Sequence, residues 1–172
     1  GPGAENAFGG VAQAYADNVP VLLIPGGSTE SRVGVHPGFD AVPNYQHVTK
    51  WAARIESVQR IPEMVSRAFT HLKHGRPGPV LLELPSDVGS ADVPVDIEEY
   101  QPVKTYKSRA STEDVRDIMT ALLKADKPMI SAGQGTLYAE ATDDLVELSE
   151  LVNIPVMTTL SGKSAFPEDH HL

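Results

Sequence analysis

The sequence predicts an α/β fold built from parallel-sheet, Rossmann-like three-layer units, arranged as two partial domains. Helical spacing of apolar residues alternates along the chain with short, wholly apolar runs, which is the pattern of parallel strands covered on both faces. A proline-containing acidic stretch without helical period divides the two alternating regions. We therefore expect a first domain over residues 1–88, a linker over 89–110 and a second domain over 111–172.

The first domain is expected to contain two helices, two strands and one long loop. A helix over residues 4–17 places Ala4, Phe8, Val11 and Tyr15 on one face. The apolar run 21–24 predicts a buried parallel strand, and the loop 26–44 is long enough to suggest a functional role. A second helix over 61–74 and a strand over 80–84 complete this domain.

The stretch from Ser86 to Arg109, which contains the linker, carries a cluster of carboxylates: Asp87, Asp92, Asp96, Glu98 and Glu99. Such a run could be a cation-binding arm or a solvated connector between domains. No fixed ligand spacing is visible, so the connector is the favoured interpretation.

The second domain is expected to contain a βαβ crossover preceded by a helix. Strands are predicted at 128–132 and 154–158, with a helix over 139–152 between them. Ser111 or Thr112 is expected to cap the preceding helix. The apolar face of that helix, expected to lie in the core, consists of Val115, Ile118, Met119, Leu122 and Leu123.

Composition excludes several classes of function. The 172 residues carry a net charge of −9, which disfavours nucleic-acid and anionic-membrane surfaces. No apolar run is long enough to predict a membrane span, and the N-terminus does not resemble a signal peptide, so a cytoplasmic location is expected. The absence of cysteine excludes disulfides, thiolate metal sites and cysteine nucleophiles.

The histidines predict no metal site. His71 and His74 lie three residues apart near a helix end, where cationic side chains suit the helix dipole, so a surface role is favoured. His170 and His171 are interpreted as part of a terminal loop.

Two glycine motifs have a possible binding role and a simpler structural one. Gly1-Pro2-Gly3 at a helix start could hold a polar ligand group, or could serve only to begin the helix. Gly133-Gln134-Gly135 lies between a strand and a helix, the context of a phosphate-binding turn. Its third fingerprint glycine is replaced by Tyr138, so a plain tight turn is the alternative.

These blocks together resemble thiamine-diphosphate enzymes of the acetolactate synthase group. Residues 1–6, 21–27 and 75–88 are similar to the pyrimidine-binding domain, while 127–135 and 153–170 are similar to the central domain. The resemblance covers nearly the whole chain, and it implies a fragment that spans the end of one domain and the start of the next.

The resemblance implies that the parent protein is a C–C lyase or carboligase acting on a small-molecule 2-oxo acid. It would use thiamine diphosphate with Mg²⁺ and would form a homodimer or homotetramer. Pro2, Gly3 and Asn6 would lie near the aminopyrimidine ring. Phe39 and Asp40 would line the substrate pocket, where the family commonly has a Phe-Gln pair.

The central-domain resemblance makes FAD a possible second cofactor, with Gly133, Gly135 and Thr159 as its candidate contacts. No catalytic residue and no metal ligand is assigned, because the family's catalytic glutamate and its Gly-Asp-Gly…Asn segment match nothing here; Glu5 does not take that role. The fragment alone is therefore expected to be inactive. The alternatives are a flavin- or nucleotide-binding module without thiamine chemistry, and a non-catalytic interaction domain.

Overall fold

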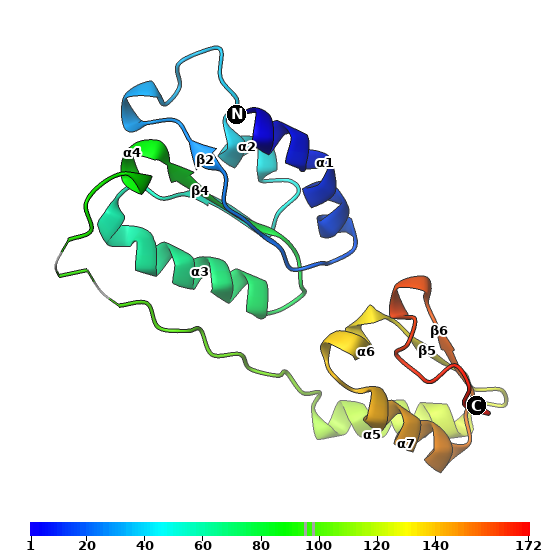
Figure 1. The fold of residues 1–172 in the computed structure, drawn as a ribbon. Coiled ribbons are helices and arrows are strands. Elements are labelled where there is room, and N and C mark those ends of the chain that lie inside the picture. The colour runs from blue at the N-terminus through cyan, green and yellow to red at the C-terminus, as the bar shows by residue number, and fades with distance from the viewer. Residues whose placement is uncertain (95, 98) are drawn as a thin grey trace. The chain divides into compact units, whose positions relative to one another are not determined.

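The computed structural model describes residues 1–94, 96–97 and 99–172. The chain forms two compact units, Gly1–Tyr106 and Lys107–Leu172, each built from helices and parallel strands (Figure 1). The predicted α/β class is confirmed. The domain limits and linker proposed from the sequence remain predictions.

The sheet of the first unit is organised around β4 (Val80–Pro85). On one side β4 pairs with β1 (Leu22–Leu23) and then with β2 (Gly26–Gly27). Both short strands pair with β4 in the same register, so they follow one another along the same edge of β4. On the other side it pairs with β3 (Trp51–Arg54). All pairings are parallel, so the carboxyl ends of the strands meet at one edge.

Helices cover both faces of this sheet. α1 (Pro2–Ala16) packs through Ala4 and Val11 against Leu81, and α3 (Ile61–Lys73) packs through Met64 and Ala68 against the opposite face of β4. Successive residues of a strand point to opposite faces of the sheet, so neighbouring residues of β4 pack against different helices. The result is the predicted three-layer arrangement, with α1 and α3 on opposite sides of the strands (Figure 1).

The first unit also contains short elements that the sequence did not predict. The expected loop 26–44 includes β2, a 3₁₀ turn at Glu30–Arg32 and α2 (Ala41–Tyr45). β3 was not predicted, and α4 (Ser86–Gly89) begins the stretch that was interpreted as extended. Elements of two to five residues are too short to show a hydrophobic period, so pattern analysis cannot detect them.

The strand predicted at 21–24 is shorter and less buried than expected. Only Leu22 and Leu23 pair with β4, and both are half-buried, while Val21 and Ile24 are exposed. Within the described residues β1 has a partner strand on one side only, so its apolar run is not enclosed as a central strand's would be.

The second unit contains a parallel pair, β5 (Ile130–Ala132) and β6 (Val156–Thr158), connected through α6 (Gln134–Tyr138) and α7 (Thr142–Val152). The predicted βαβ order is confirmed. The Gly133–Gly135 stretch, predicted as a turn, instead begins α6, and α7 starts three residues later than the helix expected from Ala139.

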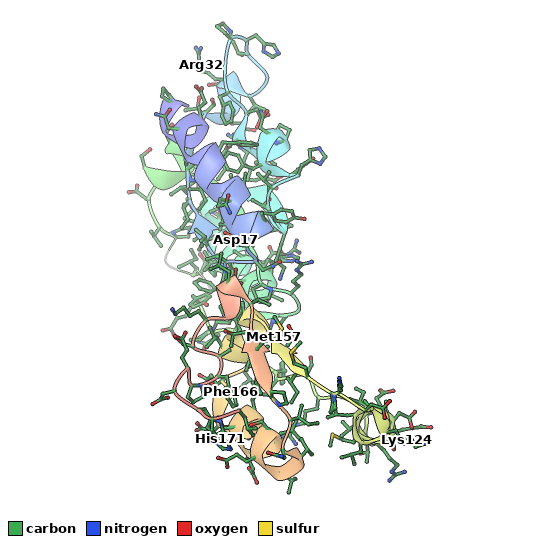
Figure 2. All side chains as sticks on the ribbon, turned by 90° about the vertical axis from the view of Figure 1, so that its right-hand side faces the viewer. Asp17, Arg32, Lys124, Met157, Phe166 and His171 are labelled. Atoms are coloured by element: carbon green, nitrogen blue, oxygen red, sulfur yellow. The ribbon has the colours of Figure 1, made fainter. Side chains whose placement is uncertain are left out.

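α5 (Thr112–Lys124) confirms one prediction and contradicts another. The Ser111 hydroxyl accepts the backbone N–H of Asp114 at 3.1 Å, which is the predicted N-cap. However, the helix buries no residue: Val115, Ile118 and Leu123 are 47%, 63% and 66% exposed. Figure 2 shows α5, which ends at Lys124, standing apart from the strand that carries Met157. The expected core position of its apolar face is therefore wrong for this structure.

Residues 99–110 and the described residues of 90–97 form no helix or strand. Glu98 of the acidic cluster lies outside the described residues. None of the described helices has the length and apolar content needed to cross a membrane.

Candidate functional site

The start of α1 borders a pocket of about 350 Å³ beside the β1–β2 line. Its lining consists of Gly1, Gly3, Ala4, Leu23, Pro25 and Gly26. Of the three predicted cofactor-proximal residues, only Gly3 lines this pocket, and the space where its Cβ would lie is open. Pro2 and Asn6 lie exposed on the same first turns of the helix.

Both predicted substrate-pocket residues line a second pocket, of about 170 Å³, at the carboxyl edge of the sheet. Phe39 and Asp40 form one wall, from the end of the loop that follows β2. Arg54, at the end of β3, and Glu83, in β4, form another. The loop itself supplies the remaining lining, including Arg32 and His36. Parallel α/β sheets bind ligands at this edge.

Arg54 and Glu83 form a partly buried ion pair that the sequence analysis missed. Arg54 Nη1 lies 2.7 Å from Glu83 Oε1, and Glu83 is only 4% exposed. Arg54 also donates to the carbonyl oxygen of Ser28. A Cβ on Gly27 would lie 2.6 Å from the Glu83 carboxylate carbon, so glycine leaves room for this side chain. The pair thus joins β3, β4 and the loop after β2.

Asp87 anchors the same loop from α4. Its Oδ2 accepts the backbone N–H of Glu30 at 2.8 Å, and this hydrogen bond is the main reason that the pKa of Asp87 lies below its usual range. The sequence analysis had placed Asp87 among the solvated linker carboxylates. Only the three-dimensional fold brings it to the loop.

A small aromatic cluster connects the two pockets. Tyr45 of α2 is completely buried, and its hydroxyl donates to the carbonyl oxygen of Ala4 in the first turn of α1. Its ring meets Phe8 edge-on at 5.1 Å and Phe39 edge-on at 6.5 Å between ring centroids. Burial raises the pKa of the Tyr45 hydroxyl, which therefore stays protonated and remains a donor.

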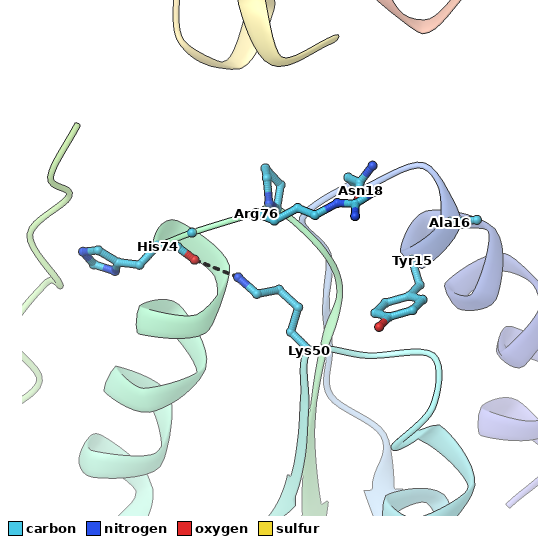
Figure 3. Close-up of a pocket in the computed structure, with 8 residues that line it drawn as sticks. Tyr15, Ala16, Asn18, Lys50, His74 and Arg76 are labelled. Carbon is cyan, nitrogen blue, oxygen red and sulfur yellow. Dashed lines mark hydrogen bonds between the residues drawn. The ribbon is translucent and has the colours of Figure 1, made fainter. Parts of the chain in front are cut away.

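A third pocket, of about 380 Å³, lies at the amino ends of β3 and β4, away from the predicted site residues (Figure 3). Lys50 lies in it and donates to the carbonyl oxygens of His74, at 2.8 Å, and His71. These are carbonyls at the end of α3, which lack partners within the helix. Burial lowers the pKa of Lys50.

His71 is not the surface residue that the sequence predicted. Its ring stacks on Trp51 with centroids 5.2 Å apart and an interplanar angle of 17°. Burial, with a smaller contribution from the nearby Lys50 ammonium, lowers the pKa of His71. His71 therefore takes part in packing α3 on β3.

In the second unit, two of the three candidate flavin contacts come together. Thr159 follows β6, and its backbone N–H donates to the carbonyl of Ala132 at the end of β5, at 2.9 Å. A Cβ on Gly133 would lie 3.8 Å from Thr159 Oγ1, whereas Gly135 faces open space. Gly162 was missed by the sequence analysis: a Cβ there would lie 2.7 Å from the Ala132 carbonyl oxygen.

In the part of the chain that the structure describes, no three His, Asp or Glu side chains are grouped closely enough to hold a metal ion. His170 instead pairs with Glu150 at 3.1 Å and meets Phe166 edge-on at 4.9 Å between centroids. The C-terminal segment is thereby packed on α7.

Residues 115–172 match the family model described as thiamine pyrophosphate enzyme, central domain. Over 100% of its length the chain is similar to a probable acetolactate synthase large subunit of Methanocaldococcus jannaschii, with 38% identity, and covers 30% of that protein. It is also similar to glyoxylate carboligase of Escherichia coli O157:H7, at 33% identity, and to acetolactate synthase of Arthrospira platensis, at 34%.

In each of these two the chain again matches over its full length, and it covers 29% and 31% of the relatives. The chain thus spans about 30% of the length of the curated relatives it matches. These findings confirm the resemblance to thiamine-pyrophosphate enzymes of the acetolactate synthase group that the sequence motifs indicated.

Proposed function

We propose that the protein containing this chain is a thiamine-diphosphate-dependent carboligase or lyase acting on 2-oxo acids, similar to acetolactate synthase. The observation that carries the proposal is the similarity of the whole chain, through both units in the same order, to acetolactate synthases and glyoxylate carboligase. The chain supplies part of the site and is not expected to turn over substrate alone.

The start of α1 fits a cofactor ring. Gly3 presents no side chain, and the pocket beside it is lined by backbone and small apolar groups. A planar ring can approach such a surface closely, and the first turn offers unpaired N–H groups. Pro2, Gly3 and Asn6 would therefore hold the aminopyrimidine. When bound, thiamine diphosphate supplies a carbanion that attacks the substrate carbonyl.

The pocket lined by Phe39 and Asp40 fits a small acid. Its volume of about 170 Å³ suits a substrate of a few heavy atoms, and Phe39 supplies an apolar wall that excludes water. Arg54 is held rigidly by Glu83, which pre-organises the polar wall. Mg²⁺ and the diphosphate would be held elsewhere in the protein, and the active form would be a homodimer or homotetramer.

FAD is proposed as an accessory cofactor, held by Gly133, Gly135 and Thr159. The meeting of Gly133 and Thr159 at the carboxyl edge of β5 and β6 supports this placement. The same observation favours the second candidate function, a flavin- or nucleotide-binding module without thiamine chemistry. Flavin absorbance without thiamine-dependent turnover would support that alternative.

The test of this proposal is an assay of the full-length protein with thiamine diphosphate and Mg²⁺, with pyruvate and glyoxylate as separate substrates. We expect cofactor-dependent CO₂ release and a new C–C bond with at least one of them. In calorimetry, the chain alone should bind thiamine diphosphate weakly. Tight, saturable binding by the chain would contradict the expectation that the diphosphate is held elsewhere in the protein.

A further inference from the structure

One buried side chain contacts the walls of both the pocket at the start of α1 and the pocket at the carboxyl edge of the sheet. Tyr45 contacts Ala4, which lines the pocket at the start of α1, and Phe39, which lines the pocket at the carboxyl edge of the sheet. These segments lie more than thirty residues apart, and the sequence analysis had marked both as binding regions without connecting them.

The position of Tyr45 is fixed from several directions. Its own carbonyl oxygen accepts the Thr49 hydroxyl at 2.8 Å and the Val48 N–H at 3.1 Å, which hold the end of α2. Its ring is enclosed by Phe8 and Phe39. The side chain is 0% exposed, so the ring has no free volume into which to swing.

The hydroxyl makes this packing specific. A buried tyrosine O–H that loses its acceptor is left unsatisfied, and that is costly in an apolar cluster. The bond to the Ala4 carbonyl therefore selects one position of the first turn of α1 relative to α2. Because the ring also contacts Phe39, a shift of either pocket wall displaces the other.

We propose that Tyr45 is a positioning residue that couples the two pockets, setting the place of Phe39 relative to the first turn of α1. The identity of the ligands in those pockets rests on the proposed function, but the mechanical coupling does not. An occupant that moves the start of α1 changes the shape of the pocket around Phe39 through this one side chain.

The test compares Tyr45→Phe with Tyr15→Phe. Tyr15 lies on α1 and is 44% exposed, so its variant loses the same hydroxyl outside the cluster. Both variants are labelled with 3-fluorophenylalanine, which gives one ¹⁹F resonance for each of the four native phenylalanines. The substituted position adds a fifth resonance, which is identified by its absence from the parent chain and is not compared. Phe8 and Phe39 report the cluster, and Phe69 and Phe166 report the rest of the chain.

We expect Tyr45→Phe to shift both cluster resonances and leave the other two unchanged. Amide exchange in the first turns of α1 should become about five-fold faster, the factor that corresponds to one lost hydrogen bond. Tyr15→Phe should change none of these signals.

Movement of only one cluster resonance, or of neither, would overturn the coupling. Equal movement of all four resonances, or the same response in Tyr15→Phe, would also overturn it, since a general loosening would then explain the data. The measurement needs no thiamine diphosphate. Failure of the full-length protein to use that cofactor would therefore refute the proposed function and leave this result intact.

Discussion

Replacing Glu83 by glutamine should destabilise the first unit strongly, although the two side chains have nearly the same shape. Breaking a buried ion pair by neutralising one partner typically costs about 3–5 kcal/mol. Here Arg54 is 23% exposed and has a second acceptor in the Ser28 carbonyl, which relieves part of that cost. We therefore expect Glu83→Gln to cost about 2 kcal/mol.

The assay is urea unfolding followed by the fluorescence of Trp51, the chain's only tryptophan, which lies in the same strand as Arg54. With a slope of about 1–3 kcal/mol per molar urea, the midpoint should fall by about 1 M. Glu63→Gln is the matched control: its surface pairs with Arg60 and Arg67 should together contribute less than about 1 kcal/mol.

A double variant separates the effect of an unpaired charge from simple loss of a side chain. Replacing both partners by apolar residues, Arg54→Met with Glu83→Leu, should recover most of the lost stability, because no buried charge is left without a partner. If Glu83→Gln moves the midpoint no more than Glu63→Gln does, or if the double variant is as unstable as the single one, the reasoning is refuted.

Three further predictions concern single positions. Gly162→Ala should cost about 1–3 kcal/mol by overpacking against the end of β5, measured by thermal unfolding, whereas Gly135→Ala should cost much less. Burial holds the pKa of His71 below its usual range, so the unfolded chain binds a proton at this side chain more tightly than the folded chain does. The stability of the chain should therefore decline as the pH falls through about 6.5 toward the folded-state pKa. His71→Gln should flatten that part of the pH–stability profile. The pKa of Asp87 is also lowered, so its contribution to the stability of the folded chain should be complete above a pH of about 4. That contribution should be lost as the pH falls through the folded-state pKa of Asp87. In Asp87→Asn the backbone amide of Glu30 should exchange faster at neutral pH. A pH-stability profile identical in the His71 variant and the parent chain, or an unchanged Glu30 exchange rate, would contradict the corresponding prediction.

Long elements with strong period could be predicted from the sequence. α1, α3 and the Ser111 cap of α5 follow the expected residues closely, because more than ten residues of helical spacing leave little ambiguity. β3 could not be predicted in the same way. Its four residues include two alanines and an arginine, and its strand conformation depends on pairing with β4.

The candidate site likewise contains residues that a local motif predicts and residues that depend on long-range strand pairing. Gly3 and Phe39 were marked by motif, and the structure shows pockets at both. The Arg54–Glu83 pair depends on the register of two strands that are distant in sequence, so no local pattern reveals it. The exposed apolar face of α5 shows the reverse error: a clean stripe predicts burial, but burial also needs a partner surface.

The measurement that tests the central claim most directly is the turnover of pyruvate and glyoxylate by the full-length protein, with and without thiamine diphosphate and Mg²⁺. The account predicts CO₂ release and carboligation that require the cofactor and weaken when Phe39 is replaced by alanine. No cofactor-dependent turnover of either acid, in a protein that is folded and contains both units, would contradict the assignment to 2-oxo acid carboligation.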